Sequence, residues 1–506
     1  MSSSLHRFTT SAALLCSIVA VAGCSSIPQS PDASESSTDR RELHWAACPE
    51  DVRKGSGEQT RLECSTVTVP LDYHEPDGAQ IDLTVSRLAS TNPDTRRGVL
   101  LLNPGGPGGA GLDQPTFLAD RGLPQRVRET YDLIGMDTRG VGHSSPISCG
   151  FTNDQDYRGN IPPYAVDDSA VTDQADLSRN IAAHCADHDR SGVMPHVTTA
   201  NMARDLDRIR AALGEDTASF LGYSYGSGLG AAYASLFPDR TDRIVLDSNL
   251  GDTHLNRDGL RRYAIGMEQT FPDFAAWVSA RHDRYHLGRT PDDVRRTYLH
   301  LADHLDQNPV DGIDGALFRL STFVTLYNSG SYEKAAESWV SYVNPRPTSD
   351  VPPPTTSDLS PNDNGWSVFL AVTCNDIQWP TDVDVYRRGV AEDRERYPLF
   401  GAASANISPC AFWKRENAEP PVPVNSSGPS NVLIVQNQRD PVTPLRGGQL
   451  LNDKFGDRSR LVTIDGSGHG GYVLGSNLCA DDAVTRYLVD GVMPERDLAC
   501  ERSARR

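Results

Sequence analysis

Gly222-Tyr223-Ser224-Tyr225-Gly226 is a glycine-flanked serine turn that lies between a strand-like run and a helix-like run. The run Ala218-Ser219-Phe220-Leu221 before it reads as a buried strand, and residues 228–237 after it read as a helix stopped by Pro238. Strand, Gly-x-Ser-x-Gly turn and helix in this order form a nucleophile elbow, whose serine is held in a strained backbone conformation. The alternative is a serine in an ordinary surface turn. The context favours a nucleophilic Ser224.

Strand-like and helix-like runs alternate on both sides of this turn. Apolar runs at residues 98–102, 131–136 and 243–247 read as strands. Apolar residues at helical spacing between 202 and 213 read as an amphipathic helix. This alternation predicts a mainly parallel sheet with helices on both faces.

A helix-rich stretch interrupts this rhythm. The chain has 506 residues, more than one compact core usually holds, and residues 251–426 are helix-rich with aromatic patches. Strand-like runs resume at 431–435 and 460–464. We therefore expect an α/β core built from residues 43–250 and 427–506, with a helical cap of residues 251–426 inserted before the last strands.

The charge of the chain is strongly acidic. Asp and Glu number 67 against 48 Lys and Arg, which gives a formal net charge of −19. Such a surface repels phosphate backbones and anionic lipid headgroups, so nucleic-acid binding is disfavoured. No uninterrupted apolar span is long enough for a transmembrane helix.

The N-terminal sequence is typical of a targeting segment. His6 and Arg7 precede an apolar run that ends in Val21-Ala22-Gly23-Cys24, which is similar to a bacterial lipobox. We expect a lipoprotein signal peptide at residues 1–23, a lipidated Cys24 and a polar tether at 24–42. The predicted location is extracytoplasmic, anchored to the cell membrane, with partial release to the wall or medium. The alternative is an ordinary signal peptide in which Cys24 is incidental.

The cysteine pattern predicts disulfides. Ten cysteines are present, and eight remain once Cys16 and Cys24 are set aside with the leader. Eight cysteines allow 105 connectivities, but loop closure favours sequential neighbours. The expected pairs are Cys48–Cys64, Cys149–Cys185, Cys374–Cys410 and Cys479–Cys500.

Two further residues complete a nucleophilic constellation with Ser224. A serine hydroxyl needs a base, and the base needs an orienting carboxylate. In this type of fold the chain order is Ser, then Asp or Glu, then His. Asp440 follows the strand-like run 431–435, and His469 follows the run 460–464 on a glycine-rich loop. A helix cap at Asp440 and a surface-loop His469 are the alternatives, but three candidates in the required order favour a triad.

Two other carboxylates compete with Asp440 for the role of the orienting acid. Asp247 also follows a strand and is a real second choice. Asp465 is only four residues before His469, too close in sequence to orient its ring, and is expected to fix its own loop.

A glycine-rich loop at residues 103–111 follows the strand-like run 98–102. It lacks the patterns of a phosphate loop or a dinucleotide site. Its backbone N–H groups are candidates for an oxyanion hole, with Gly105 and Gly106 as loop donors beside the N–H of Tyr225.

No cofactor or metal is expected. The pairs His184/His188 and His282/His286 have helical spacing that a metal could use, but neither includes the Glu of an H-E-x-x-H motif. The solvated-helix interpretation is preferred for both.

Six short motifs spread over nearly the whole mature chain carry a family resemblance. They are Asn103-Pro104-Gly105-Gly106-Pro107-Gly108-Gly109, Asp137-Thr138-Arg139-Gly140, Gly222-Tyr223-Ser224-Tyr225-Gly226, Val372-Thr373-Cys374-Asn375-Asp376, Asp440-Pro441-Val442-Thr443-Pro444 and Gly468-His469-Gly470. Together they resemble the exported tripeptidyl aminopeptidases of actinobacteria, which have the α/β-hydrolase fold and are related to proline iminopeptidases. Thr138 and Ala110 depart from the family pattern, where Pro and Ser are usual.

The resemblance implies an exported serine exopeptidase that releases short peptides, tripeptides by expectation, from free N-termini of peptide or protein substrates. It also suggests Asp376 as the partner of the substrate ammonium, against the alternative of a solvated surface aspartate. The second hypothesis is an exported esterase or lipase with the same triad. A non-catalytic surface-binding module is the third, and the complete triad argues against it. The only membrane contact expected is the N-terminal lipid.

Overall fold

The computed structural model describes residues 43–53, 61–155, 157, 159–343, 358–414 and 419–502. The described residues form one compact unit. The expected signal peptide at 1–23, the lipid site Cys24 and the tether at 24–42 lie outside the described residues.

A single sheet runs through the described part of the chain. Its ten strands have the order β1-β2-β3-β5-β4-β6-β7-β8-β9-β10 among the described residues. The strands are β1 (Ala46–Ala47), β2 (Leu62–Pro70), β3 (Gln80–Leu88), β4 (Gly98–Asn103), β5 (Tyr131–Met136), β6 (Ala218–Tyr223), β7 (Thr241–Asp247), β8 (Val432–Arg439), β9 (Ser459–Ser467) and β10 (Leu498–Cys500). The pairs β1–β2, β2–β3 and β3–β5 are antiparallel. The pairs β5–β4, β4–β6, β6–β7, β7–β8, β8–β9 and β9–β10 are parallel.

Helices cover both faces of this sheet. The helices outside the long insertion are α1 (Glu50–Arg53), α2 (Gln114–Asp120), α3 (Gln125–Thr130), α4 (Asp168–His188), α5 (Thr199–Ala212), α6 (Tyr225–Leu236), α15 (Leu445–Phe455) and α16 (Leu478–Asp490). Apolar side chains of α2, α3 and α16 share one core with the sheet, and those of α5, α6 and α15 share another. All residues of β4, β5 and β6 are buried because both faces are covered. The predicted mainly parallel α/β sheet is confirmed.

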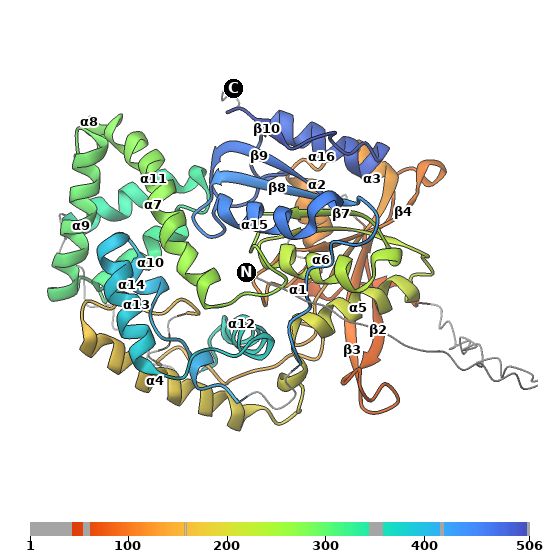
Figure 1. Ribbon diagram of the computed structural model, residues 1–506, viewed down its shortest axis with the longest axis horizontal. Coiled ribbons are helices and arrows are strands. Elements are labelled where there is room, and N and C mark those ends of the chain that lie inside the picture. The colour runs from red at the N-terminus through yellow and green to blue at the C-terminus, as the bar shows by residue number, and fades with distance from the viewer. Residues whose placement is uncertain are drawn as a thin grey trace, which may run out of the picture. The chain divides into compact units, whose positions relative to one another are not determined.

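Eight α-helices follow β7 and precede β8 within the described residues. They are α7 (Arg257–Ser279), α8 (His282–Tyr285), α9 (Pro291–Gln307), α10 (Gly315–Thr325), α11 (Tyr332–Val343), α12 (Asp363–Asp376), α13 (Val383–Arg396) and α14 (Gly401–Ser404). An aromatic cluster of Phe271, Phe274, Tyr298 and Trp339 holds α7, α9 and α11 together. Helix α4, which precedes β6 in the chain, also packs against α13 and α14 (Figure 1). The helical layer therefore draws on residues outside the predicted range 251–426, and the cap boundaries stay a prediction.

Within the described ranges, four disulfides tie loops and helices to the sheet and to one another. They are Cys48–Cys64, Cys149–Cys185, Cys374–Cys410 and Cys479–Cys500, with sequence separations of 16, 36, 36 and 21. All four are the predicted pairs. Each closes a short loop, in keeping with the low entropic cost of joining near neighbours. Among the helices described, none has the length and apolar character needed to cross a bilayer.

Candidate active site

Ser224 occupies a tight turn between β6 and α6. Its φ of 57° and ψ of −122° place it in a conformation that L-residues rarely adopt. The turn is held because the Ser224 N–H donates to the Asp247 carbonyl at 2.9 Å, and the Ser224 carbonyl accepts from Ser227. A Cβ on Gly222 would lie 2.3 Å from the Gly226 carbonyl oxygen. The glycines are therefore needed for steric reasons, as the elbow pattern predicts.

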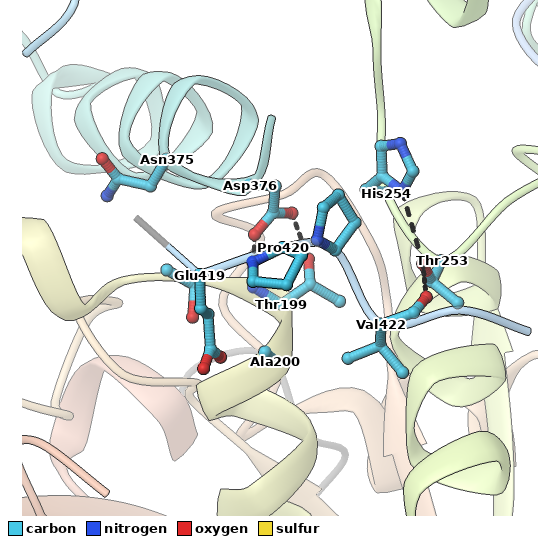
Figure 2. Close-up of a pocket in the computed structure, with 11 residues that line it drawn as sticks. Thr199, Ala200, Thr253, His254, Asn375, Asp376, Glu419, Pro420 and Val422 are labelled. Atoms are coloured by element: carbon cyan, nitrogen blue, oxygen red, sulfur yellow. Dashed lines mark hydrogen bonds between the residues drawn. The ribbon is translucent and has the colours of Figure 1, made fainter. Parts of the chain in front are cut away.

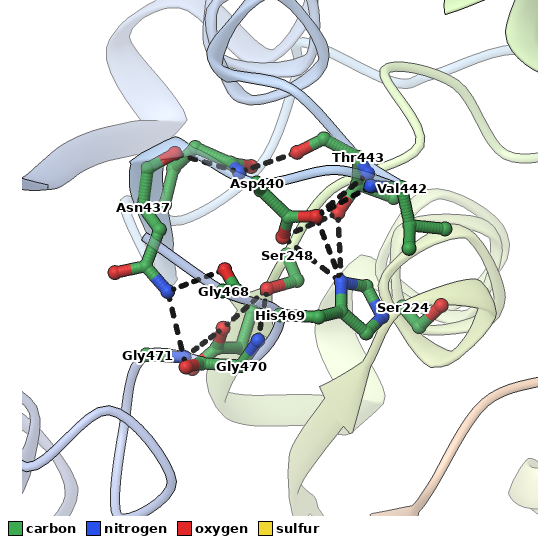
Figure 3. A network of polar contacts seen from close by, with 12 residues as sticks. Ser224, Ser248, Asn437, Asp440, Val442, Thr443, Gly468, His469, Gly470 and Gly471 are labelled. Atoms are coloured by element: carbon green, nitrogen blue, oxygen red, sulfur yellow. Dashed lines mark hydrogen bonds and ion pairs between the residues drawn. The ribbon is translucent and has the colours of Figure 1, made fainter. Parts of the chain in front are cut away.

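Asp440 and His469 are brought together from the ends of β8 and β9. The Asp440 carboxylate is fully buried and lies 2.9 Å from His469 Nδ1 through Oδ2. It also accepts from the Val442 and Thr443 N–H groups and from the Thr443 hydroxyl, each at 2.9 Å. Figure 3 shows Ser224 beside the edge of the imidazole that faces away from Asp440. These contacts fix the carboxylate and, through it, the imidazole.

The environment of His469 favours its protonated form. Burial lowers the pKa of the imidazole, but the charge of Asp440 and its hydrogen bond, with a further contribution from Asp247, raise the pKa above its ordinary value. The side chain is 15% exposed, so one edge of the ring still faces open space. In this environment the His469 imidazole can accept a proton during a reaction and release it afterwards.

Two helical segments of the insertion contact the loops that carry these residues. In α7, Gly266 lies against the Asp440 turn, where an added Cβ would meet the carbonyl oxygens of Pro441 and Asp440 at 2.3 and 2.6 Å. The carbonyl of Tyr327, just after α10, accepts the His469 N–H at 2.7 Å. The insertion therefore helps to place the acid and the base, besides covering them.

Ser224 and His469 open onto one cleft of about 440 Å³. Its wall is mostly apolar and aromatic, and it comes from the sheet loops and the inserted helices alike. The lining residues are Pro104, Gly106, Gly159, Asn160, Ile161, Ser224, Tyr263, Leu320, Val324, Tyr327, Trp366, Phe369, Val442 and His469. No carboxylate is among these described lining residues.

The glycine-rich loop lies directly against the serine turn. A Cβ on Gly105 would be 2.4 Å from the Tyr223 carbonyl oxygen and 3.1 Å from the Tyr225 nitrogen. The Gly105 N–H donates to the Asn103 side chain at 3.0 Å, so this donor is already engaged. Gly106 lines the cleft beside Ser224. Of the two predicted loop donors, only Gly106 is among the described lining residues of the cleft.

The competing carboxylates have other partners. Asp465 pairs with Arg439 at 2.6 Å and is half exposed, in keeping with a role in its own loop. Asp247 is fully buried and accepts the backbone N–H groups of Gly471 and Tyr472. The His469 nitrogen Nδ1 forms its carboxylate hydrogen bond with Asp440.

Asp376 lies apart from the cleft that holds Ser224. Its carboxylate accepts the Thr199 N–H at 2.8 Å and the Thr199 hydroxyl at 2.6 Å, at the start of α5 (Figure 2). It borders a separate cavity of about 10 Å³, room for about one water molecule. The structure does not bring Asp376 together with Ser224; the carboxylate binds the first N–H of α5, whose N-cap residue is Thr198.

Sequence reasoning missed some polar residues at the site. Thr443 bonds Asp440 and lies 3.3 Å from His469 Nδ1 through its hydroxyl. Its position three residues after Asp440 is a local signal that could have found it. Ser248 and Asn437 bond the backbone of the His469 loop, and no local signal marks them. In the described ranges, no three His, Cys, Asp or Glu side chains are grouped as a metal site.

Comparison with known proteins gives consistent similarities. The alpha/beta hydrolase fold family matches residues 98–476. The tripeptidyl aminopeptidase of Streptomyces lividans is 35% identical over 91% of this chain and 87% of its own length. The serine protease Hip1 of Mycobacterium tuberculosis is 30% identical over 90% of this chain and 91% of its own. Carboxylesterase B of Mycobacterium tuberculosis is 29% identical over 90% and 89%.

The contact of α7 with the Asp440 turn leads to a prediction. Gly266→Ala forces the helix or the turn to move, and we expect the reaction of Ser224 with a fluorophosphonate to slow about ten- to a hundredfold. The matched control is Gly259→Ala on the same helix, whose Cβ would meet the flexible end of Leu255. Its labelling rate should stay within about twofold of wild type. Equal labelling rates for the two variants would contradict the proposed packing role.

Proposed function

This chain belongs to the α/β-hydrolase family, among the relatives of the tripeptidyl aminopeptidases, and from that membership we propose that it removes short peptides from free N-termini. It is a serine hydrolase of the peptidase type. The proposal extends this to an exopeptidase that releases tripeptides. The similarity to the tripeptidyl aminopeptidases supports the release of tripeptides, and the serine chemistry is supported by His469, which is bonded to the buried Asp440 and shares one cleft with Ser224.

In the proposed mechanism, Ser224 Oγ attacks the scissile carbonyl carbon while His469 Nε2 takes the hydroxyl proton. Asp440 keeps the Nδ1–H tautomer and stabilises the imidazolium that forms. The imidazolium then gives the proton to the leaving amine as the C–N bond breaks. A water molecule, deprotonated by His469, hydrolyses the acyl-enzyme and frees the peptide and Ser224.

The negative oxygen of the tetrahedral intermediate needs backbone donors. We assign this role to the N–H groups of Tyr225 and Gly106. The N–H of Gly105 is bonded to Asn103, so Gly105 contributes by its lack of a side chain, which lets the loop approach the serine turn.

One observation favours a second candidate function. The described cleft lining is apolar and aromatic, without a carboxylate to pair with a substrate ammonium. One relative carries the name carboxylesterase B. An esterase with the same three residues is therefore the second candidate.

Acetylation of the substrate N-terminus distinguishes an exopeptidase from an esterase. A peptidase that binds the free N-terminus loses one partner of a charge pair when the substrate is acetylated, which typically costs about 3–5 kcal/mol. We expect a free tripeptide p-nitroanilide to be cleaved at least about a hundredfold faster than its N-acetyl form. Release of p-nitroaniline measures both rates, and Ser224→Ala is the control for background.

Equal rates for the free and acetylated tripeptides would remove the exopeptidase proposal. Faster turnover of a simple p-nitrophenyl ester than of either peptide would then support the esterase. Unchanged peptidase activity in Ser224→Ala would remove both.

We also propose export and lipid anchoring at Cys24. The sequence Val21-Ala22-Gly23-Cys24 after an apolar run supports the anchor, and four disulfides are typical of an oxidising compartment. Cys24→Ser should abolish incorporation of radiolabelled palmitate in the host bacterium, whereas the matched leader variant Cys16→Ser should retain it. Labelling of Cys24→Ser at the wild-type level would contradict the anchor.

A further inference from the structure

The loop that carries His469 has no regular secondary structure, yet each backbone N–H from residue 468 to 473 has an acceptor outside the loop. Gly468 donates to the Arg439 carbonyl and His469 to the Tyr327 carbonyl. The next four donors reach side chains. Gly470 donates to Ser248 Oγ at 2.8 Å, Gly471 and Tyr472 donate to Asp247 at 2.9 and 2.7 Å, and Val473 donates to Asp481 at 3.0 Å.

Asp247 differs from the other acceptors because it contacts two parts of the site. Its carboxylate holds the loop two and three residues after His469. Its backbone carbonyl accepts the Ser224 N–H at 2.9 Å. This one residue, at the end of β7, thus connects the turn of the nucleophile with the loop of the base.

Backbone strain explains why such a connection is needed. Ser224, Ser248 and Val473 have positive φ values of 57°, 58° and 65°. Such conformations persist only where the surroundings determine them strongly. Figure 3 shows Ser248 and Asn437 at the same loop, where Asn437 donates to the Gly468 and Gly470 carbonyls. Without these contacts the loop would relax, and His469 would move relative to Ser224.

We propose that Asp247 is a positioning residue that couples the turn of Ser224 to the loop of His469 and so sets their relative placement. The inference rests on the proposed function, because it concerns the same Ser224 and His469.

The electrostatics of the site agree with this role. Burial raises the pKa of Asp247 to about 6, so the group is largely ionised at neutral pH. Burial has the largest effect on the pKa of His469 and lowers it. The charge of Asp440 raises this pKa, and the negative charge of Asp247 raises it by a smaller amount. The other groups that face Asp247 and His469 are the hydroxyls of Thr443 and Ser248 and the rings of Tyr223 and Tyr327. The loss of the Asp247 charge should therefore lower the pKa of His469.

The test uses Asp247→Asn in the full-length protein. Both carboxylate oxygens accept a backbone N–H, and an amide offers only one oxygen, so one of the two hydrogen bonds is lost. The probe is a fluorophosphonate, which reacts with an activated serine whatever the natural substrate. We expect its second-order rate constant to fall about ten- to a hundredfold. The acid limb of its pH profile should move to lower pH, which a purely structural defect would not cause.

Asp481→Asn is the matched control. Asp481 also accepts a backbone N–H from this loop, and burial raises its pKa as well, but its partner is Val473, farther along from His469. We expect its labelling rate to stay within about twofold of wild type, with the acid limb unmoved. The same loss and the same shift in both variants would show a general effect on the loop and overturn the inference.

The outcomes separate the inference from the proposed function. If the fluorophosphonate does not label Ser224 of the wild type, the proposed function is wrong. If it does, and Asp247→Asn matches wild type in rate and pH profile, the positioning role is wrong. Circular dichroism checks folding. If Asp247→Asn does not fold, Ser248→Ala, which removes the acceptor of Gly470 and a donor to Asp247, must lower the rate, and the acid limb should move in the same direction. An unchanged rate in Ser248→Ala overturns the inference.

Discussion

Asp440 is a carboxylate with no exposure to water, and a buried charge is tolerated only when donors and a countercharge replace its hydration. Three donors come from its own turn, through Val442 and Thr443, and the fourth is the imidazole of His469. The turn therefore holds the carboxylate by contacts that do not involve the imidazole. The orientation of His469, and with it any proton transfer from Ser224, depends on this one compensated charge.

The inserted helices are part of this arrangement as well as of the cleft. Helix α7 lies on the Asp440 turn through Gly266, and Tyr327 both lines the cleft and accepts the His469 N–H. The same segments that contact a substrate therefore also hold the base. A change of the Tyr327 side chain is expected to alter the placement of His469 together with substrate selection, because its ring lines the cleft and also packs edge-on against the imidazole.

Local sequence patterns predicted the features that depend on residues close together in the chain. The elbow around Ser224, the strands before Asp440 and His469, and the four disulfides between near neighbours all depend on a few adjacent residues or on short loops. Asp376 could not be placed in this way, because its partner Thr199 is 177 residues away. For the same reason, nothing in the sequence marked Ser248 as an acceptor for Gly470, 222 residues later. Packing of α4 on the inserted helices likewise has no local signal.

The central claim is that Ser224 forms the acyl-enzyme with the N-terminal fragment of the substrate. Rapid acid quenching of the wild-type protein during turnover of a tripeptide p-nitrophenyl ester, followed by intact mass spectrometry and peptide mapping, tests this directly. A mass increase equal to the tripeptide acyl group is expected on the peptide that contains Ser224. An adduct on another residue, or sustained turnover with no covalent adduct in the first milliseconds, would contradict it.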